Sequence, residues 1–93
     1  MTYANILITG ATSGIGEALA IHYAQTGAEN LFICGRNKER MAEVKQRCED
    51  RGAKVYAELI DVTDMETMHH WIEKANQIAS LDLVIANAGV NNQ

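Results

Sequence analysis

The feature that most constrains this sequence is a turn with three glycines between an apolar run and a helical pattern. Residues 6–20 read ILITGATSGIGEALA, and the turn carries Gly10, Gly14 and Gly16. A turn that opens a helix offers unpaired backbone N–H groups and the positive end of the helix dipole, which suit a pyrophosphate. We interpret Gly10 as permitting the tight turn, Gly14 as letting phosphates approach the backbone, and Gly16 as allowing close packing of helix on strand.

The spacing of these glycines narrows the class of ligand. It is G-x-x-x-G-x-G rather than the common dinucleotide spacing G-x-G-x-x-G. No Gly-Lys-Ser/Thr follows, so the turn is not a P-loop and hydrolysis of a magnesium nucleotide is not expected. The turn alone leaves one alternative open, in which the glycines only lead a strand into a helix.

Short apolar runs alternate with helical patterns along the whole chain. The runs predict strands over 4–8, 31–34, 55–60 and 83–86, and the helical patterns cover 13–25, 38–51 and 64–79. Nearly continuous apolar runs are typical of strands buried on both faces, and strict alternation favours a parallel sheet with right-handed crossovers. We expect the strand order 3-2-1-4, with two helices on one face and the third on the other. Residues 1–93 are expected to form one domain.

Local patterns also predict how the helices begin and pack. Asn37 is expected to cap the second helix, and Thr63, with Glu66 in a capping box, the third. Helical spacing places Ile15 in the buried stripe of the first helix and Met65 in that of the third. Trp71 is expected to pack at a helix surface.

Composition excludes several functions. The net charge of −4 argues against nucleic acid and anionic membrane surfaces as partners. No secretory signal and no apolar stretch long enough to span a membrane is present in this sequence. Cys34 and Cys48 lack the spacing of a disulfide framework, which predicts free thiols in the cytoplasm. His69 and His70 are adjacent and diverge on a helix, so no metal site is expected.

Arg36 follows the second predicted strand, where dinucleotide-binding folds place an acidic residue that binds the adenosine ribose. No carboxylate here would repel a 2′-phosphate, and a guanidinium can pair with one. A charge-assisted contact contributes about 1.5–3 kcal/mol, which predicts a roughly tenfold to hundredfold preference for NADP over NAD. The alternative is that Arg36 is a solvated loop charge.

Asp61 and Val62 follow the third predicted strand, at the edge where open parallel sheets bind ligands. The Asp61 carboxylate could accept a hydrogen bond from an adenine amino group while Val62 packs on the ring. The alternative is that Asp61 caps the next helix, although Thr63 already fills that role in our interpretation.

Three motifs in this order, Thr9-Gly10 with Gly14-Ile15-Gly16, then Asp61-Val62, then Asn87-Ala88-Gly89, resemble the short-chain dehydrogenase/reductase family over essentially the whole chain. The resemblance implies a three-layer, Rossmann-like α/β fold, here a partial doubly wound sheet. It also implies hydride transfer between NAD(P) and an alcohol or ketone. The cofactor-binding residues that follow are Thr9, Gly10, Ser13, Gly14, Ile15, Gly16, Arg36, Asn37, Asp61, Val62, Asn87, Ala88 and Gly89. The family usually has Asn-Asn-Ala-Gly, whereas this chain has Ala86 before Asn87.

The family's catalytic residues have no match in this chain. In the family a Tyr and a Lys four residues later, with an upstream Ser, carry the proton transfer. None of Tyr3, Tyr23 and Tyr56 has a lysine four residues later. We therefore assign no catalytic residue, expect the pair beyond Gln93, and expect these 93 residues alone to be inactive.

Three functions compete at this point. The first is the NADP(H)-binding portion of a short-chain oxidoreductase whose small substrate is an alcohol or ketone. The second is a stand-alone dinucleotide-binding or regulatory module without catalysis. The third is an interaction protein that has lost the ligand, against which the intact glycines argue. If the chain ends at Gln93, an exposed fourth strand predicts self-association or marginal stability.

Overall fold

Strands and helices alternate along the chain as the sequence predicts. The computed structural model describes residues 3–12, 14–61 and 63–87. The elements are β1 (Asn5–Thr9), α1 (Gly14–Gln25), β2 (Asn30–Gly35), α2 (Lys38–Glu49), β3 (Lys54–Leu59), α3 (Met65–Ile78) and β4 (Leu83–Ala86). Their ends lie within about two residues of the expected ones, a difference that frayed helix ends and strand ends commonly produce.

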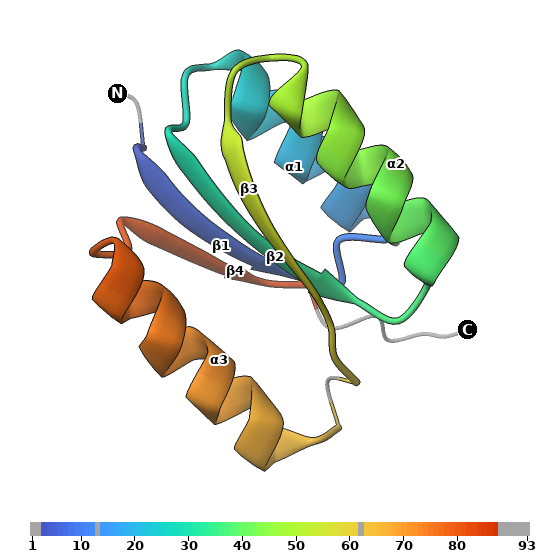
Figure 1. The fold of residues 1–93 in the computed structure, drawn as a ribbon, viewed down its shortest axis with the longest axis vertical. Helices are drawn as coiled ribbons and strands as arrows, with labels where there is room; N and C mark the ends of the chain where they lie inside the picture. The colour runs from blue at the N-terminus through green and yellow to red at the C-terminus, as the bar shows by residue number, and fades with distance from the viewer. Residues whose placement is uncertain (1–2, 13, 62, 88–93) are drawn as a thin grey trace.

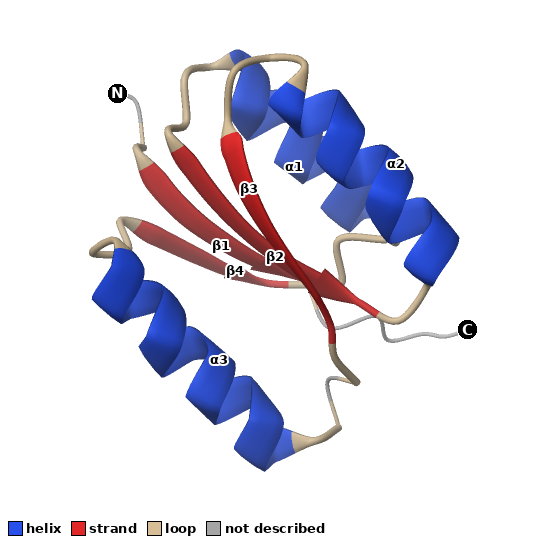
Figure 2. Ribbon diagram, in the orientation of Figure 1, coloured by secondary structure: helices blue, strands red, loops and turns tan. Residues whose placement is uncertain are grey.

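The four strands form one parallel sheet between two layers of helix. The strand order is β3-β2-β1-β4, and every pairing in the sheet is parallel. Helices α1 and α2 lie together on one face and α3 lies on the other (Figure 1). The three layers are evident in Figure 2, where the strands lie between the helices. The expected Rossmann-like architecture and strand order are confirmed.

The core has a part on each face of the sheet. Ile6 and Ile8 of β1 pack with the residues buried under α1 and α2, whereas Leu7 packs with Trp71 and Ala75 of α3. Side chains alternate between the faces of a strand, so a central strand covered on both sides must be apolar at every position. In β1 and β2 every buried position is apolar except Thr9, the last residue of β1.

The edge strands depart from that expectation. In β4, Leu83 and Ile85 pack against the cluster on the α1 and α2 side, but Val84 is 50% exposed. Strand β3 also has exposed positions. Burial on both faces is therefore wrong for β3 and β4. Each has one neighbouring strand among the described residues, and α3 alone cannot cover the whole of its face.

Two predicted helix faces are also corrected. Ile15 is 70% exposed and Met65 is 74% exposed, so neither belongs to a buried stripe. The buried residues of α1 are Gly16, Glu17, Ala20 and Ala24. The small residues recur every fourth position and let α1 lie close to the sheet, which turns Ile15 to solvent.

Trp71 is buried rather than at a helix surface. It packs in the cluster that contains Leu7 and Phe32, and it provides much of the apolar surface that α3 places on the sheet. The predicted packing role of Trp71 is confirmed, although its side chain is buried rather than at the surface.

The helix caps are partly as predicted. Asn37 caps α2, since its Oδ1 accepts a hydrogen bond from the backbone N–H of Arg40 at 2.9 Å. The cap of α3 is Asp64 rather than Thr63, because Asp64 accepts hydrogen bonds from the backbone N–H and the hydroxyl of Thr67. Thr63 donates to Asp61 instead. The cap therefore lies one residue later than predicted, and its partner is Thr67 rather than Glu66.

Asp64 should make the stability of the protein depend on acid. The hydrogen bonds from Thr67 lower the pKa of Asp64 below its ordinary value of 3.8. A carboxyl with a lowered pKa stabilises the fold above its unfolded pKa, and this stabilisation is lost as the pH falls through the folded pKa. We expect the melting temperature to fall below about pH 4, and to fall less in Asp64→Asn, which caps without titrating. Equal acid sensitivity of the two proteins in thermal unfolding would contradict this.

The two cysteines are free and buried, which confirms the predicted thiols. Burial raises the pKa of both Cys34 and Cys48 to about 11, so neither carries a thiolate at neutral pH.

In the described part of the chain, no helix is both long enough and apolar enough to cross a membrane.

Candidate functional site

The predicted site residues gather at one edge of the sheet. In a parallel sheet the C-terminal ends of all strands meet at the same edge, and here Thr9 pairs with Ala86 and Gly35 with Leu59. The order reverses between β1 and β4, because the chain leaves β1 toward β2 on one side and β4 lies on the other. Open parallel sheets bind ligands in the crevice at such a reversal.

The glycine turn after β1 packs closely against Asn87, the residue that follows β4, and is hydrogen-bonded to it. Gly10 has φ +67°, in the left-handed region that favours glycine. A side chain there would also collide with the backbone carbonyl oxygen of Asn87, whose Nδ2 donates a hydrogen bond to the Gly10 carbonyl at 3.2 Å. The backbone conformation of Gly10 fits the tight turn predicted for it, and Asn87 lies beside it.

The other two glycines of the turn differ from each other. A Cβ at Gly16 would overlap the Gly10 carbonyl oxygen and approach Asn87 Nδ2 to 2.8 Å, so close packing requires Gly16. A Cβ at Gly14 would meet nothing within 4 Å among the described residues. Gly14 is the exposed first residue of α1, where backbone N–H groups have no partner within the helix. This open helix start has room for an anion such as a phosphate.

The loop after β2 packs against the same turn. Gly35 is buried, and a Cβ there would lie 2.7 Å from Thr12 Oγ1. Arg36 and Asn37 follow on the exposed side, with the Asn37 amide oxygen occupied by its capping bond to Arg40. Close packing at Gly35 therefore fixes the point at which Arg36 leaves the sheet.

Asp61 lies after β3 at the same edge and is exposed. Its Oδ1 accepts hydrogen bonds from the backbone N–H of Thr63 at 2.9 Å and from the Thr63 hydroxyl at 2.7 Å. These bonds, together with the positive charge of Arg36, lower the pKa of Asp61 below 3.8. Asp61 is thus ionised at neutral pH, and its negative charge interacts with the positive charge of Arg36.

The remaining predicted residues are of two kinds. Thr9 is buried as the last residue of β1, and Ile15 is exposed on the first turn of α1. Four more lie outside the described residues, namely Ser13, Val62, Ala88 and Gly89.

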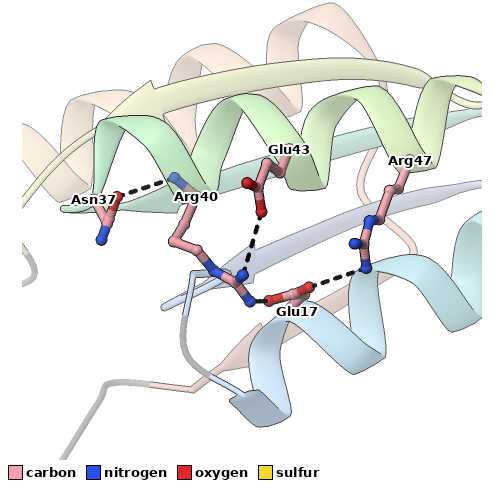
Figure 3. Close-up of polar contacts among 5 residues, drawn as sticks. All are labelled: Glu17, Asn37, Arg40, Glu43 and Arg47. Carbon is pink, nitrogen blue, oxygen red and sulfur yellow. Dashed lines mark hydrogen bonds and ion pairs between the residues drawn. The ribbon is translucent and has the colours of Figure 1, made fainter.

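Sequence analysis missed a buried carboxylate next to the glycine turn. Glu17 follows Gly16 directly, and its side chain is 11% exposed. It makes ion pairs with Arg40 and Arg47 of α2 (Figure 3). The signal was present, because Glu17 lies three residues before Ala20 and seven before Ala24 and so shares their helix face, and the two arginines are seven residues apart. Only the packing of α1 on α2 identifies them as partners.

A hollow of about 230 Å³ lies elsewhere, between α3 and strands β2 and β3. Aromatic rings of Phe32, Tyr56 and Trp71 line it, and none of the predicted cofactor residues does. No group of three or more potential metal ligands is present among the residues that the structure describes. The glycine turn, rather than this hollow, is therefore the candidate site.

The fold and the glycine turn together define a Rossmann-like α/β protein. A model of the family described as short chain dehydrogenase matches residues 4–93. The chain belongs to the short-chain dehydrogenase family.

Named relatives are consistent with this assignment. The hydroxysteroid 11-beta-dehydrogenase 1-like protein of Xenopus tropicalis is 37% identical over 84 residues, which cover 88% of this chain and 29% of that protein. A short-chain type dehydrogenase/reductase from Mycobacterium ulcerans has a TM-score of 0.87 at 26% identity, covering 99% of this chain and 35% of its own. L-sorbose reductase from Gluconobacter frateurii, complexed with NADPH and L-sorbose, has a TM-score of 0.82 at 26% identity, covering 98% and 35%.

These coverages show that the chain spans about a third of the length of the relatives it matches. The similarity lies in the part that holds β1 to β4 and the glycine turn. The rest of each relative has no counterpart in these 93 residues.

Proposed function

We propose that this chain is the NADP(H)-binding portion of a short-chain oxidoreductase that transfers hydride between NADP(H) and an alcohol or ketone. The observation that carries the proposal is the glycine turn. It is locked by Gly10, Gly16 and Asn87, yet it leaves Gly14 open at the start of α1. Packing explains two of the three glycines, and an approaching phosphate explains the third.

Different residues at this edge of the sheet are proposed to bind different parts of the cofactor. The first turn of α1 would hold the diphosphate, Arg36 and Asn37 the adenosine ribose phosphate, and Asp61 the adenine. The proposed binding set also includes Thr9, Gly10, Ser13, Gly14, Ile15, Gly16, Val62, Asn87, Ala88 and Gly89. When bound, the nicotinamide supplies or accepts the hydride.

A preference for NADP over NAD rests on charge. Arg36 follows Gly35 on the exposed side of the loop after β2, and no acidic residue precedes it there. A guanidinium pairs well with a phosphate, whereas a ribose diol gains little from it. The L-sorbose reductase that resembles this chain is complexed with NADPH. Asp61 is the nearby acidic residue, and its proposed partner is the adenine amino group rather than the ribose.

Catalysis is proposed for the whole enzyme rather than for these residues. No tyrosine of the chain has a lysine four positions later, so no proton-transferring pair is assigned, and the 93 residues alone should be inactive. A stand-alone dinucleotide-binding or regulatory module remains the second candidate on the same ground.

The net charge of −4 and the buried thiols support a cytoplasmic protein without nucleic acid or membrane partners. Self-association is proposed for the stand-alone module, in which β4 would leave Val84 exposed.

Thermal unfolding with and without dinucleotides tests the binding proposal. A ligand that binds only the folded state stabilises it by about 2.7 kcal/mol at one hundred times its dissociation constant. NADPH should therefore raise the melting temperature at a lower concentration than NADH. Adenosine serves as the control, because it lacks the phosphates that the glycine turn would bind. Equal melting temperatures with and without either dinucleotide would contradict the proposal.

A further inference from the structure

Glu17 joins the two helices that begin at the proposed cofactor site. We infer that Glu17 is a positioning residue, which sets the preference for NADPH by holding the start of α2, and with it Arg36, against the glycine turn. This inference rests on the proposed function, because it concerns the same dinucleotide. Glu17 itself need not touch the cofactor.

The contacts of Glu17 span two turns of α2. Its Oε1 pairs with Arg40 Nη2, and its Oε2 lies 3.6 Å from Arg47 Nη1 (Figure 3). Each carboxylate oxygen thus pairs with a different guanidinium, and the separation of seven residues between these arginines corresponds to about two helical turns. The Glu17 carboxylate is nearly buried, whereas the Arg40 and Arg47 side chains are 44% and 56% exposed, so the pairs are anchored at their buried end. The two pairs connect one position on α1 to two positions on α2.

Short connections run from both ends of this link to the site. On the α1 side, Glu17 follows Gly16, which packs against Gly10 and Asn87. On the α2 side, the backbone N–H of Arg40 donates to Asn37 Oδ1 at 2.9 Å, and Asn37 follows Arg36. A shift of Arg40 would therefore move the residues proposed to meet the 2′-phosphate, while the diphosphate turn stayed in place.

A positioning role and a purely electrostatic role of Glu17 predict opposite changes in NADPH affinity when Glu17 is replaced by glutamine. Glu17 lies in the first turn of α1, close to where an anion would bind. By charge alone, replacing it with glutamine would remove a repulsive carboxylate and release two guanidiniums, so both dinucleotides would bind more tightly. Loss of position predicts the opposite for NADPH and little change for NADH.

The test measures dissociation constants of NADPH and NADH for the full chain and its Glu17→Gln variant, by calorimetry or cofactor fluorescence. We expect the variant to bind NADPH about tenfold more weakly, a typical size for coupling between sites, with NADH binding nearly unchanged. Glu43→Gln is the matched control. It removes another carboxylate partner of Arg40, at an exposed position, and should leave both constants unchanged.

Combining variants separates positioning from general loss of structure. In an Arg36→Gln background, Glu17→Gln should no longer alter the ratio of the two dissociation constants, since the group that it positions is gone. If Glu17→Gln does not fold, as circular dichroism would reveal, Arg47→Gln removes only the longer of the two pairs and should show a smaller change of the same sign.

The outcomes distinguish this inference from the proposed function. A wild-type chain that binds neither dinucleotide overturns both. A wild-type chain that prefers NADPH overturns the inference alone if Glu17→Gln strengthens NADPH binding, leaves it unchanged, or weakens both dinucleotides equally. A selective loss of NADPH affinity that disappears without Arg36 supports it.

Discussion

Replacing Arg36 by aspartate is expected to reverse the cofactor preference. The substitution removes the guanidinium proposed to pair with the 2′-phosphate and places a carboxylate where it would repel that phosphate and accept hydrogen bonds from a ribose diol. Loss of one charge-assisted contact corresponds to about 1.5–3 kcal/mol, so NADPH should bind about tenfold to a hundredfold more weakly. NADH should bind as well as before or better. Titration of both dinucleotides measures the change.

The control for this substitution is Arg51→Asp. It makes the same change in net charge at an exposed position after α2, toward the opposite edge of the sheet. A long-range effect of charge would weaken NADPH binding in both variants, whereas a local contact is lost only at Arg36. If NADPH remained the preferred dinucleotide in Arg36→Asp, the assignment of Arg36 would be wrong.

Replacing Gly16 by alanine is expected to destabilise the fold strongly. The added methyl group would overlap the Gly10 carbonyl oxygen and lie 2.8 Å from Asn87 Nδ2, both of which belong to the lock between β1 and β4. Overpacking of this kind costs about 1–3 kcal/mol. Chemical denaturation of the wild type and the variant measures the difference in free energy of unfolding.

Gly14→Ala is the matched comparison, because it adds the same methyl group two residues earlier. Nothing described lies within 4 Å of that methyl, and alanine favours a helix more than glycine does. Its free energy of unfolding should therefore be unchanged or slightly higher, while NADPH binding weakens because the methyl faces the proposed phosphates. Similar destabilisation by both substitutions would show that the two glycines do not differ as the structure indicates.

The sequence was most informative where one physical rule acts alone. Continuous apolar runs identified the central strands β1 and β2, and the alternation with helices predicted the parallel sheet, whose order agrees with the family resemblance. The capping role of Asn37 and the tight turn at Gly10 also followed from local chemistry. Residues after parallel strands must share one edge, so Arg36, Asp61 and Asn87 could be grouped from their positions alone.

Prediction failed where two parts of the chain compete for the same role. Thr63 and Asp64 are both good caps, and the structure assigns Asp64 to α3 and Thr63 to Asp61. Helical spacing alone fitted Ile15 into a buried stripe, but the small residues of α1 that approach the sheet decide which side is buried. Such choices depend on contacts between elements, which local patterns do not contain.

The sequence by itself therefore determined the order of the elements, the parallel sheet and the edge at which the candidate site lies, because strand burial and turn chemistry are local properties. Only the tertiary structure decided that Gly10 and Gly16 are required by Asn87 while Gly14 is open. It also decided that Glu17 is buried between Arg40 and Arg47. These relations join residues far apart in the chain, so they exist only once α1, α2 and the strand ends are packed together.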